Sequence, residues 1–128
     1  VGDEPARASL PGEVLLETPA GGFYDWESKY VSTDGLTMSV PADIDDDVSA
    51  TVRELAVRAF DAFECEGLTR VDFFVADSGE ILINEINTMP GFTPFSMYPT
   101  MWEASGLSYN DLIDELVSLA VERPRGLR

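Results

Sequence analysis

The sequence predicts an α+β fold in which a mainly antiparallel sheet is flanked by helices. Apolar and polar residues alternate over residues 68–75 and again over 81–87, a period of two that is typical of strands. Apolar residues recur at helical spacing over residues 46–64 and 109–122. Because turn-forming residues join the two strands, we expect them to pair as an antiparallel hairpin.

Composition limits what the chain can do. Its 128 residues are enough for one domain but few for an enzyme that holds a nucleotide and two further substrates. The 24 acidic residues against 8 basic ones give a formal charge of −16, which disfavours nucleic acid and anionic membranes as partners. With one Cys and no His, zinc sites of the His/Cys type are excluded within the chain. No apolar run is long enough to cross a membrane, and no signal segment is present. We therefore expect a piece of a larger cytoplasmic protein.

The N-terminal third predicts two short strands around a loop. Residues 13–17 read as a buried strand, with residues 6–9 as a possible partner, and residues 37–40 read as another. Pro and Gly make residues 18–25 a loop. The aromatic residues that follow are too apolar for an idle surface loop, so this segment is expected to close over a ligand.

A helix is expected over residues 46–64. The acidic residues at 43–47 suit a helix N-terminus, whereas a calcium loop would need a glycine and a distal glutamate that are missing. The apolar stripe that predicts the helix consists of Val48, Val52, Leu55, Ala56, Ala59, Phe60 and Phe63. We expect this stripe to cover one face of the hairpin and to leave the other face for chemistry.

The hairpin places four polar residues on one face if it closes with an even loop centred on Ser78 and Gly79. Asp72 then lies opposite Glu85, and Arg70 opposite Asn87. The other face carries a set suited to burial, interrupted by Asn84: Val71, Phe73, Val75, Leu82 and Ile86. An odd loop would slip the register and spoil this alignment.

Two carboxylates directly opposite each other repel, so something positive should lie between Asp72 and Glu85. Together with the Asn87 amide, they offer oxygen ligands of the kind that Mg²⁺ prefers. The alternative is a solvated polar face, because alternating charge is common on exposed sheet surfaces. Spacing alone does not decide between the two.

The C-terminal part predicts a loop and a closing helix. Three prolines and a glycine keep residues 88–100 irregular: Pro90, Gly91, Pro94 and Pro99. The backbone amides of this segment are then available to bind anions. Ser108 with Asp111 approximates a capping box before the helix at 109–122, and Pro124 and Gly126 end that helix.

The run Glu85-Ile86-Asn87-Thr88-Met89-Pro90-Gly91-Phe92-Thr93, preceded by Arg70-Val71-Asp72, resembles the signature of D-alanine–D-alanine ligases of the ATP-grasp superfamily. The segment Phe23-Tyr24-Asp25-Trp26-Glu27-Ser28-Lys29-Tyr30 is similar to their substrate-covering loop, with Trp26 as a mild departure. The resemblance implies that residues 1–128 form the C-terminal catalytic region of a larger ATP-grasp ligase.

The resemblance also implies a reaction: two D-alanines are joined through an acyl phosphate, with ATP, for peptidoglycan precursor synthesis. Asp72, Glu85 and Asn87 would hold two Mg²⁺ or Mn²⁺ ions, while Lys29 and Glu85 would bind ATP. Arg70 and the Gly91 amide would stabilise the oxyanion, and Tyr30 would close the acceptor site. Substrate contacts would come from Gly91, Tyr30, Ser96 and Met97. The family commonly has Leu at the position of Met97.

The implied partners are D-alanine, ATP and the remainder of the same ligase, which as a full-length enzyme would be a cytoplasmic homodimer. Two alternatives stay open at this point. One is another ATP-grasp carboxylate-amine ligase, against which the Asn-Thr-x-Pro-Gly run argues. The other is a noncatalytic metal-binding or interaction domain.

Overall fold

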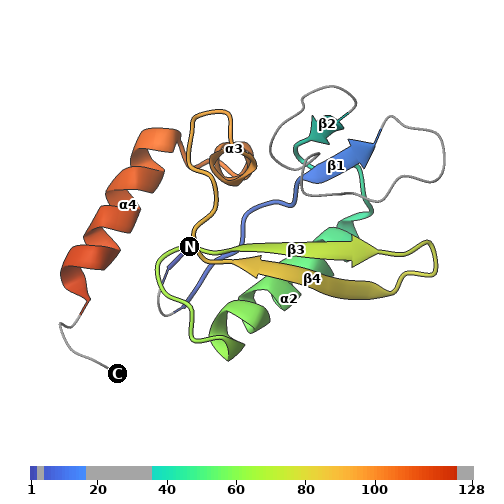
Figure 1. Cartoon of the computed structure of the whole chain (residues 1–128), viewed down its shortest axis with the longest axis horizontal. Coiled ribbons are helices and arrows are strands. Elements are labelled where there is room, and N and C mark those ends of the chain that lie inside the picture. Colours follow the sequence, from blue (N-terminus) through green and yellow to red (C-terminus); the bar gives the residue numbers. More distant parts are fainter. Residues whose placement is uncertain (3–4, 17–35, 124–128) are drawn as a thin grey trace.

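A computed structural model describes residues 1–2, 5–16 and 36–123, and within them two small antiparallel sheets and three helices (Figure 1). The elements are β1 (Glu13–Leu16), β2 (Leu36–Ser39), α2 (Asp46–Ala62), β3 (Arg70–Val75), β4 (Ile81–Asn87), α3 (Met97–Ala104) and α4 (Tyr109–Glu122). Strands β1 and β2 form one sheet and β3 and β4 the other. The predicted α+β class is confirmed.

Helix α2 lies across one face of the β3–β4 hairpin and contacts β3 (Figure 1). It begins as expected, with Asp46 and Asp47 in the first turn, where their charges meet the positive end of the helix dipole. It ends two residues earlier than predicted, because Glu64 adopts a left-handed φ of 49° and the Cys65 amide donates to the Phe60 carbonyl. Phe63 was expected in the buried stripe, but it follows the helix and is 68% exposed.

Strand β1 pairs with β2 and not with residues 6–9, so that expectation is wrong. The ladder sets Glu13 opposite Ser39 and Val14 opposite Met38. The backbone of the segment before β1 is engaged elsewhere: Arg53 donates to the Ala8 carbonyl at 3.2 Å, and the Leu10 amide donates to the Ser105 hydroxyl at 2.7 Å. These bonds tie the segment to α2 and to the residue after α3.

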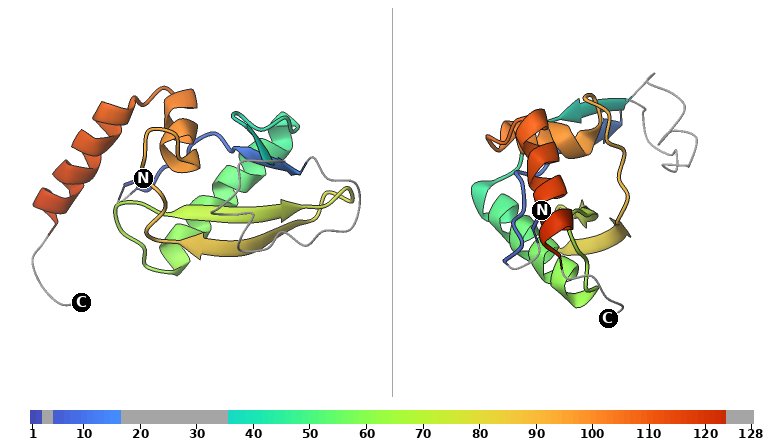
Figure 2. Two further views of the ribbon diagram at one scale, coloured as in Figure 1. Left: turned by 45° about the horizontal axis from the view of Figure 1, so that its top comes forward. Right: turned by 90° about the vertical axis from the view of Figure 1, so that its left-hand side faces the viewer.

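The main hydrophobic core lies between the start of the chain and the two C-terminal helices. It consists of Val1, Tyr98, Trp102 and Leu112, packed by Leu68, Phe92, Leu107 and Leu116. Figure 2 shows α4 beyond the end of the hairpin at which β3 begins and β4 ends, with α3 above that end. Because Phe92 belongs to the loop that connects β4 to α3, its packing against this core holds the loop in place.

Helix α3 corrects the prediction that residues 88–100 are irregular throughout. Pro99 is its third residue, a position at which the backbone nitrogen has no intrahelical partner to bond. Tyr98, Pro99 and Trp102 are all buried, so packing stabilises this short helix despite its proline.

Helix α4 has the predicted bounds and the predicted N-terminal cap. The Ser108 hydroxyl oxygen accepts from the Asp111 amide at 3.2 Å and donates to the Asp111 carboxylate at 2.6 Å. The Asp111 carboxylate thus accepts from the Ser108 hydroxyl. In a full capping box, that carboxylate would accept from the Ser108 backbone amide instead. No helix in the described part of the chain is long and apolar enough to cross a membrane.

The packing of α4 can be tested by truncating Leu112, which is fully buried in the core. We expect Leu112→Ala to lower the free energy of unfolding by about 2–5 kcal/mol, the usual cost of a cavity. Urea unfolding of the 128-residue chain measures the change. Ile113→Ala, one residue further on and 36% exposed, is the control and should cost clearly less. Equal losses would show that the core does not lie on this face of α4.

Candidate active site

The β3–β4 turn has three residues, 77–79, so the predicted even loop is wrong. The Ala76 amide donates to the Glu80 carbonyl at 2.9 Å, and the Gly79 amide donates to the Ala76 carbonyl at 2.8 Å. Gly79 has a φ of +86°, which suits glycine and closes the turn. The first three cross-strand pairs therefore differ from those expected: Val75 with Ile81, Phe74 with Leu82, and Phe73 with Ile83.

A β-bulge between Asp72 and Phe73 restores the predicted alignment nearer the start of β3. Asn84 is the extra residue, and beyond it Asp72 faces Glu85 and Arg70 faces Asn87, as predicted. With a regular ladder, Glu85 would lie opposite Val71, on the other face. The bulge thus keeps both carboxylates on one face.

The three-residue turn also changes which apolar residues share the charged face. Leu82 was expected on the buried face, but it pairs with Phe74 on the same side as Asp72. Both are open to solvent, Leu82 by 51% and Phe74 by 61%. The charged face therefore continues into an apolar pair toward the turn.

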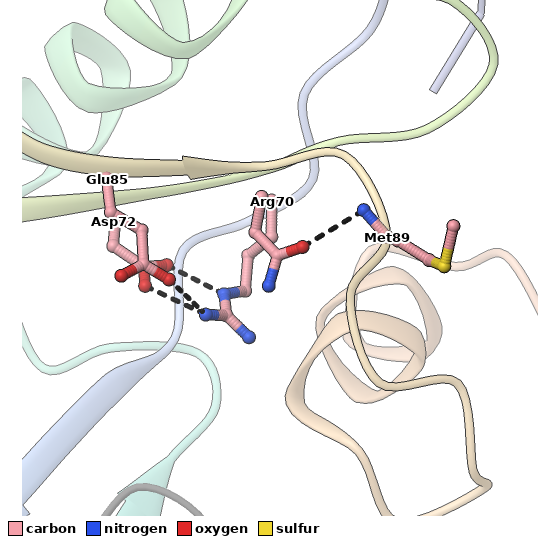
Figure 3. A network of polar contacts seen from close by, with 5 residues as sticks. Arg70, Asp72, Glu85 and Met89 are labelled. Carbon is pink, nitrogen blue, oxygen red and sulfur yellow. Dashed lines mark hydrogen bonds and ion pairs between the residues drawn. The ribbon is translucent and has the colours of Figure 1, made fainter. Parts of the chain in front are cut away.

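The guanidinium of Arg70 lies beside the two facing carboxylates and bonds both (Figure 3). Its Nε donates to Asp72 Oδ1 at 2.8 Å and its Nη2 to Asp72 Oδ2 at 3.0 Å, while the same Nη2 reaches Glu85 Oε1 at 3.3 Å. The expected positive group between the carboxylates is thus a guanidinium of the same face. The three side chains point away from α2, as predicted for the charged face (Figure 3).

The oxygens of this face fit a divalent cation that is shared with a ligand. The side chains of Asp72 and Glu85 are 27% and 36% exposed, so both carboxylates can be approached from solvent. Asn87 Oδ1 accepts from the Met89 amide at 3.0 Å, which fixes the orientation of that oxygen. In the described ranges no three His, Cys, Asp or Glu side chains form a metal-binding group. Two carboxylates and an amide are oxygen donors that could hold Mg²⁺ if water and phosphate oxygens complete its shell.

A second group of predicted site residues meets in the loop after β4. A Cβ atom added to Gly91 would lie 3.2 Å from Ser96 Oγ, so the two residues are in close contact. Met97 is the first residue of α3, and its sulfur packs close to Gly12, where an added Cβ would come within 2.7 Å of it. The structure brings Gly91 and Ser96 together and directs Met97 toward the segment before β1.

Aromatic side chains that sequence reasoning passed over hold this loop in place. The ring centroid of Phe92 lies 5.9 Å from the ring centroid of Tyr98 and 5.6 Å from that of Tyr109. The Tyr109 hydroxyl also donates to the Phe92 carbonyl at 2.8 Å. Burial raises the pKa of the Tyr98 hydroxyl well above its usual range, so it stays neutral in the core. An apolar residue between Gly91 and Thr93 was the sequence signal for this anchor.

Two predicted site residues, Lys29 and Tyr30, lie outside the described residues, as does the loop around them. The described residues therefore form two parts of a site: the charged face of the hairpin with Arg70, Asp72, Glu85 and Asn87, and the Gly91–Ser96 loop. Asn87 at the end of β4 and Met89 in the loop join the two parts by one hydrogen bond.

Comparison with known proteins points to one family. The family model described as "D-ala D-ala ligase C-terminus" matches residues 1–118. A curated D-alanine–D-alanine ligase of Arthrobacter sp. (strain FB24) is 58% identical over 127 residues, which cover 99% of this chain and 33% of the relative. The chain thus spans about a third of the length of the curated relatives it matches.

Two solved structures share the fold over most of the chain. The VanG D-Ala:D-Ser ligase from Enterococcus faecalis has a TM-score of 0.78 and 37% identity, covering 92% of this chain and 33% of that one. A D-alanine–D-alanine ligase from Bacillus anthracis complexed with ATP has a TM-score of 0.62 and 25% identity, covering 71% and 31%.

The role of Arg70 on the charged face predicts the effect of removing its charge. Arg70→Met keeps the length of the side chain but removes the guanidinium that bonds both Asp72 and Glu85. We expect the free energy of unfolding to fall by about 1–2 kcal/mol, from lost charge-assisted bonds and cross-strand repulsion, discounted for solvent exposure. Thermal unfolding in the presence of a chelator measures it.

The double variant Arg70→Met/Asp72→Asn is the control for repulsion. It removes one of the two opposed charges, so it should unfold at a higher temperature than Arg70→Met alone. If both variants melt like the unaltered protein, the guanidinium does not hold the two carboxylates together.

Proposed function

The chain belongs to the family of D-alanine–D-alanine ligase C-terminal domains, and we propose that its residues 1–128 are the C-terminal catalytic region of such a ligase. The whole enzyme would join two D-alanines with ATP to form D-alanyl-D-alanine for peptidoglycan precursors. The identity of 58% with a curated D-alanine–D-alanine ligase supports this proposal. The observation that carries it is the group of Arg70, Asp72 and Glu85 on one face, next to a loop in which Gly91 meets Ser96.

The proposed reaction has two steps. The carboxylate of the first D-alanine takes the γ-phosphoryl group of ATP, and ADP leaves. The amine of the second D-alanine then attacks the carbonyl of the acyl phosphate, so that the C–N bond forms, phosphate leaves and the amine loses a proton. Negative charge develops on the carbonyl oxygen during this attack, which is where fixed donors act.

Arg70 is suited to that oxyanion because it is oriented before substrate binds. Two bonds to Asp72 and one to Glu85 fix the plane of its guanidinium. The Gly91 amide would be the second donor, and Gly91 has no side chain to obstruct the oxygen. Donors that need no reorganisation stabilise a transition state more than mobile ones.

Asp72, Glu85 and Asn87 would hold two Mg²⁺ or Mn²⁺ ions. When bound, these ions would neutralise charge on the phosphates of ATP and of the acyl phosphate. The fit rests on the oxygen donors of one exposed face, and the relative solved with ATP supports ATP as the phosphate source.

The remaining assignments concern substrate contacts. Ser96 would donate to the carboxylate of the second D-alanine, with Met97 beside it. Lys29 would contact ATP phosphates together with Glu85, and Tyr30 would close over the acceptor amine. We propose further that the full-length enzyme is a homodimer and works in the cytoplasm, where ATP is available.

A second candidate function is ligation of D-alanine to D-serine. The VanG D-Ala:D-Ser ligase, at 37% identity, has the same fold over 92% of this chain. The identity of 58% with a D-alanine–D-alanine ligase favours D-alanine as the acceptor. Offering both amino acids in one assay separates the two activities, because D-alanyl-D-serine would form in excess only if D-serine is the preferred acceptor.

The experiment that tests the function measures phosphate release by the full-length ligase with D-alanine, ATP and Mg²⁺. We expect Asp72→Asn to lower kcat about 10- to 100-fold, because one carboxylate ligand and the negative charge opposite Arg70 are lost together. Asp77→Asn, the same change of charge in the exposed turn of the hairpin, is the matched control and should leave kcat unchanged. Equal activity of the two variants would exclude Asp72 from the site.

The isolated 128 residues should show no turnover above background. The chain spans about a third of its relatives, and we expect the site for the first D-alanine and most of the adenine pocket to come from the other two thirds. The same phosphate assay measures this. Turnover comparable to that of the full-length enzyme would show that residues 1–128 are not merely one region of the ligase.

Isothermal titration with Mg²⁺ and a nonhydrolysable ATP analogue tests the full-length protein against the noncatalytic alternative. A ligase should bind the nucleotide with a heat that depends on the metal. An interaction module should give no such heat.

A further inference from the structure

Two serines precede the C-terminal helices, and they use their hydroxyl groups differently. Ser108 caps α4 by accepting from the Asp111 amide. Ser96 occupies the same position before α3, yet its side chain makes no capping bond. The third residue of α3 is Pro99, which has no N–H to offer a capping serine.

The Ser96 hydroxyl is instead bonded by Thr93, three residues earlier. The Thr93 amide donates to Ser96 Oγ at 3.0 Å, and the hydroxyl oxygens of the two residues lie 2.9 Å apart. The Ser96 amide donates in turn to the Thr93 carbonyl at 2.9 Å. Thr93 therefore contacts Ser96 through its amide, its hydroxyl and its carbonyl.

This arrangement determines what Ser96 can do when an anion approaches. A hydroxyl has one proton and two acceptor lone pairs. If Ser96 gives its proton to the anion, the Thr93 hydroxyl must donate to Ser96 across the 2.9 Å contact, and the Thr93 amide already donates from 3.0 Å. Both lone pairs are then occupied, so Ser96 can act only as a donor, and its proton points away from Thr93.

We propose that Thr93 is a positioning residue that holds Ser96 as a hydrogen-bond donor to the carboxylate of the acceptor amino acid. This inference rests on the proposed function, in which Ser96 binds that carboxylate. Thr93 acts through Ser96 and does not itself contact the substrate.

The surroundings of the pair favour a fixed geometry. Phe92 anchors the loop directly before Thr93 through its contacts with Tyr98 and Tyr109. The hydrogen bonds that the Ser96 hydroxyl makes with Thr93 are exposed to solvent, so a ligand can reach that hydroxyl.

Thr93→Val in the full-length ligase removes the hydroxyl but keeps the shape and the amide. We expect the KM for the acceptor D-alanine to rise roughly three- to ten-fold, the loss that one net hydrogen bond represents. The KM for ATP should not change. Thr93→Ser keeps a hydroxyl and should restore the acceptor KM to within about two-fold of the unaltered enzyme.

Thr100→Val is the matched control, because Thr100 bonds the carbonyl of Ser96 and not its hydroxyl. It should leave the acceptor KM unchanged. In a Ser96→Ala background, Thr93→Val should cause no further rise, since Thr93 then has no hydroxyl to orient.

If the unaltered enzyme is active, any of three results would overturn the inference. One is that Thr93→Val leaves the acceptor KM unchanged, and another is that Thr93→Ser fails to restore it. The third is that Thr93→Val raises the acceptor KM as much in the Ser96→Ala background as in the unaltered enzyme. An unaltered full-length enzyme that forms no D-alanyl dipeptide would instead contradict the proposed function, and the inference with it. The two failures are therefore distinguishable.

Discussion

The guanidinium of Arg70 allows two carboxylates to face each other across a two-stranded sheet. Asp72 and Glu85 would repel in this position, and Arg70 meets both with charge-assisted bonds of 2.8 to 3.3 Å. The same contacts orient Arg70 before any substrate arrives. One interaction thus stabilises the hairpin without metal. In the proposed function it also orients an oxyanion donor on the face that would take a cation with phosphate.

The β-bulge at Asn84 reconciles two local demands. Turn chemistry at residues 77–79 selects a three-residue loop, because Gly79 takes the left-handed conformation that closes it. Burial requires Val71 and Ile86 to face α2, with Glu85 on the opposite side. A regular ladder from this loop would place Glu85 on the α2 face. One extra residue in β4 satisfies both demands, as bulges near active sites commonly do.

Much of this could be predicted from local patterns, and what could not depends on tertiary contacts. Helices α2 and α4 are long enough for periodicity to show, and alternation places Arg70 and Asp72 on one face of β3. The pairing of Asp72 with Glu85 was predicted from an even loop that is wrong, and it holds only because of the bulge at Asn84. Helix α3 was missed because Pro99 suggests a loop, although a proline is tolerated in a first turn and packing of Trp102 supports the helix. The partner of β1 is distant in sequence. The bonds from Thr93 to Ser96 depend on three-dimensional geometry that spacing does not reveal.

The most direct measurement is the anomalous scattering of Mn²⁺ in crystals of the full-length ligase with a nonhydrolysable ATP analogue. We predict Mn²⁺ within coordination distance, about 2.1–2.2 Å, of oxygens from Asp72, Glu85 and Asn87 and of the phosphates. We also expect Arg70 still to contact Asp72. Mn²⁺ bound to the phosphates alone, with Asp72 and Glu85 turned only toward Arg70, would contradict the claim that this hairpin face is the metal site.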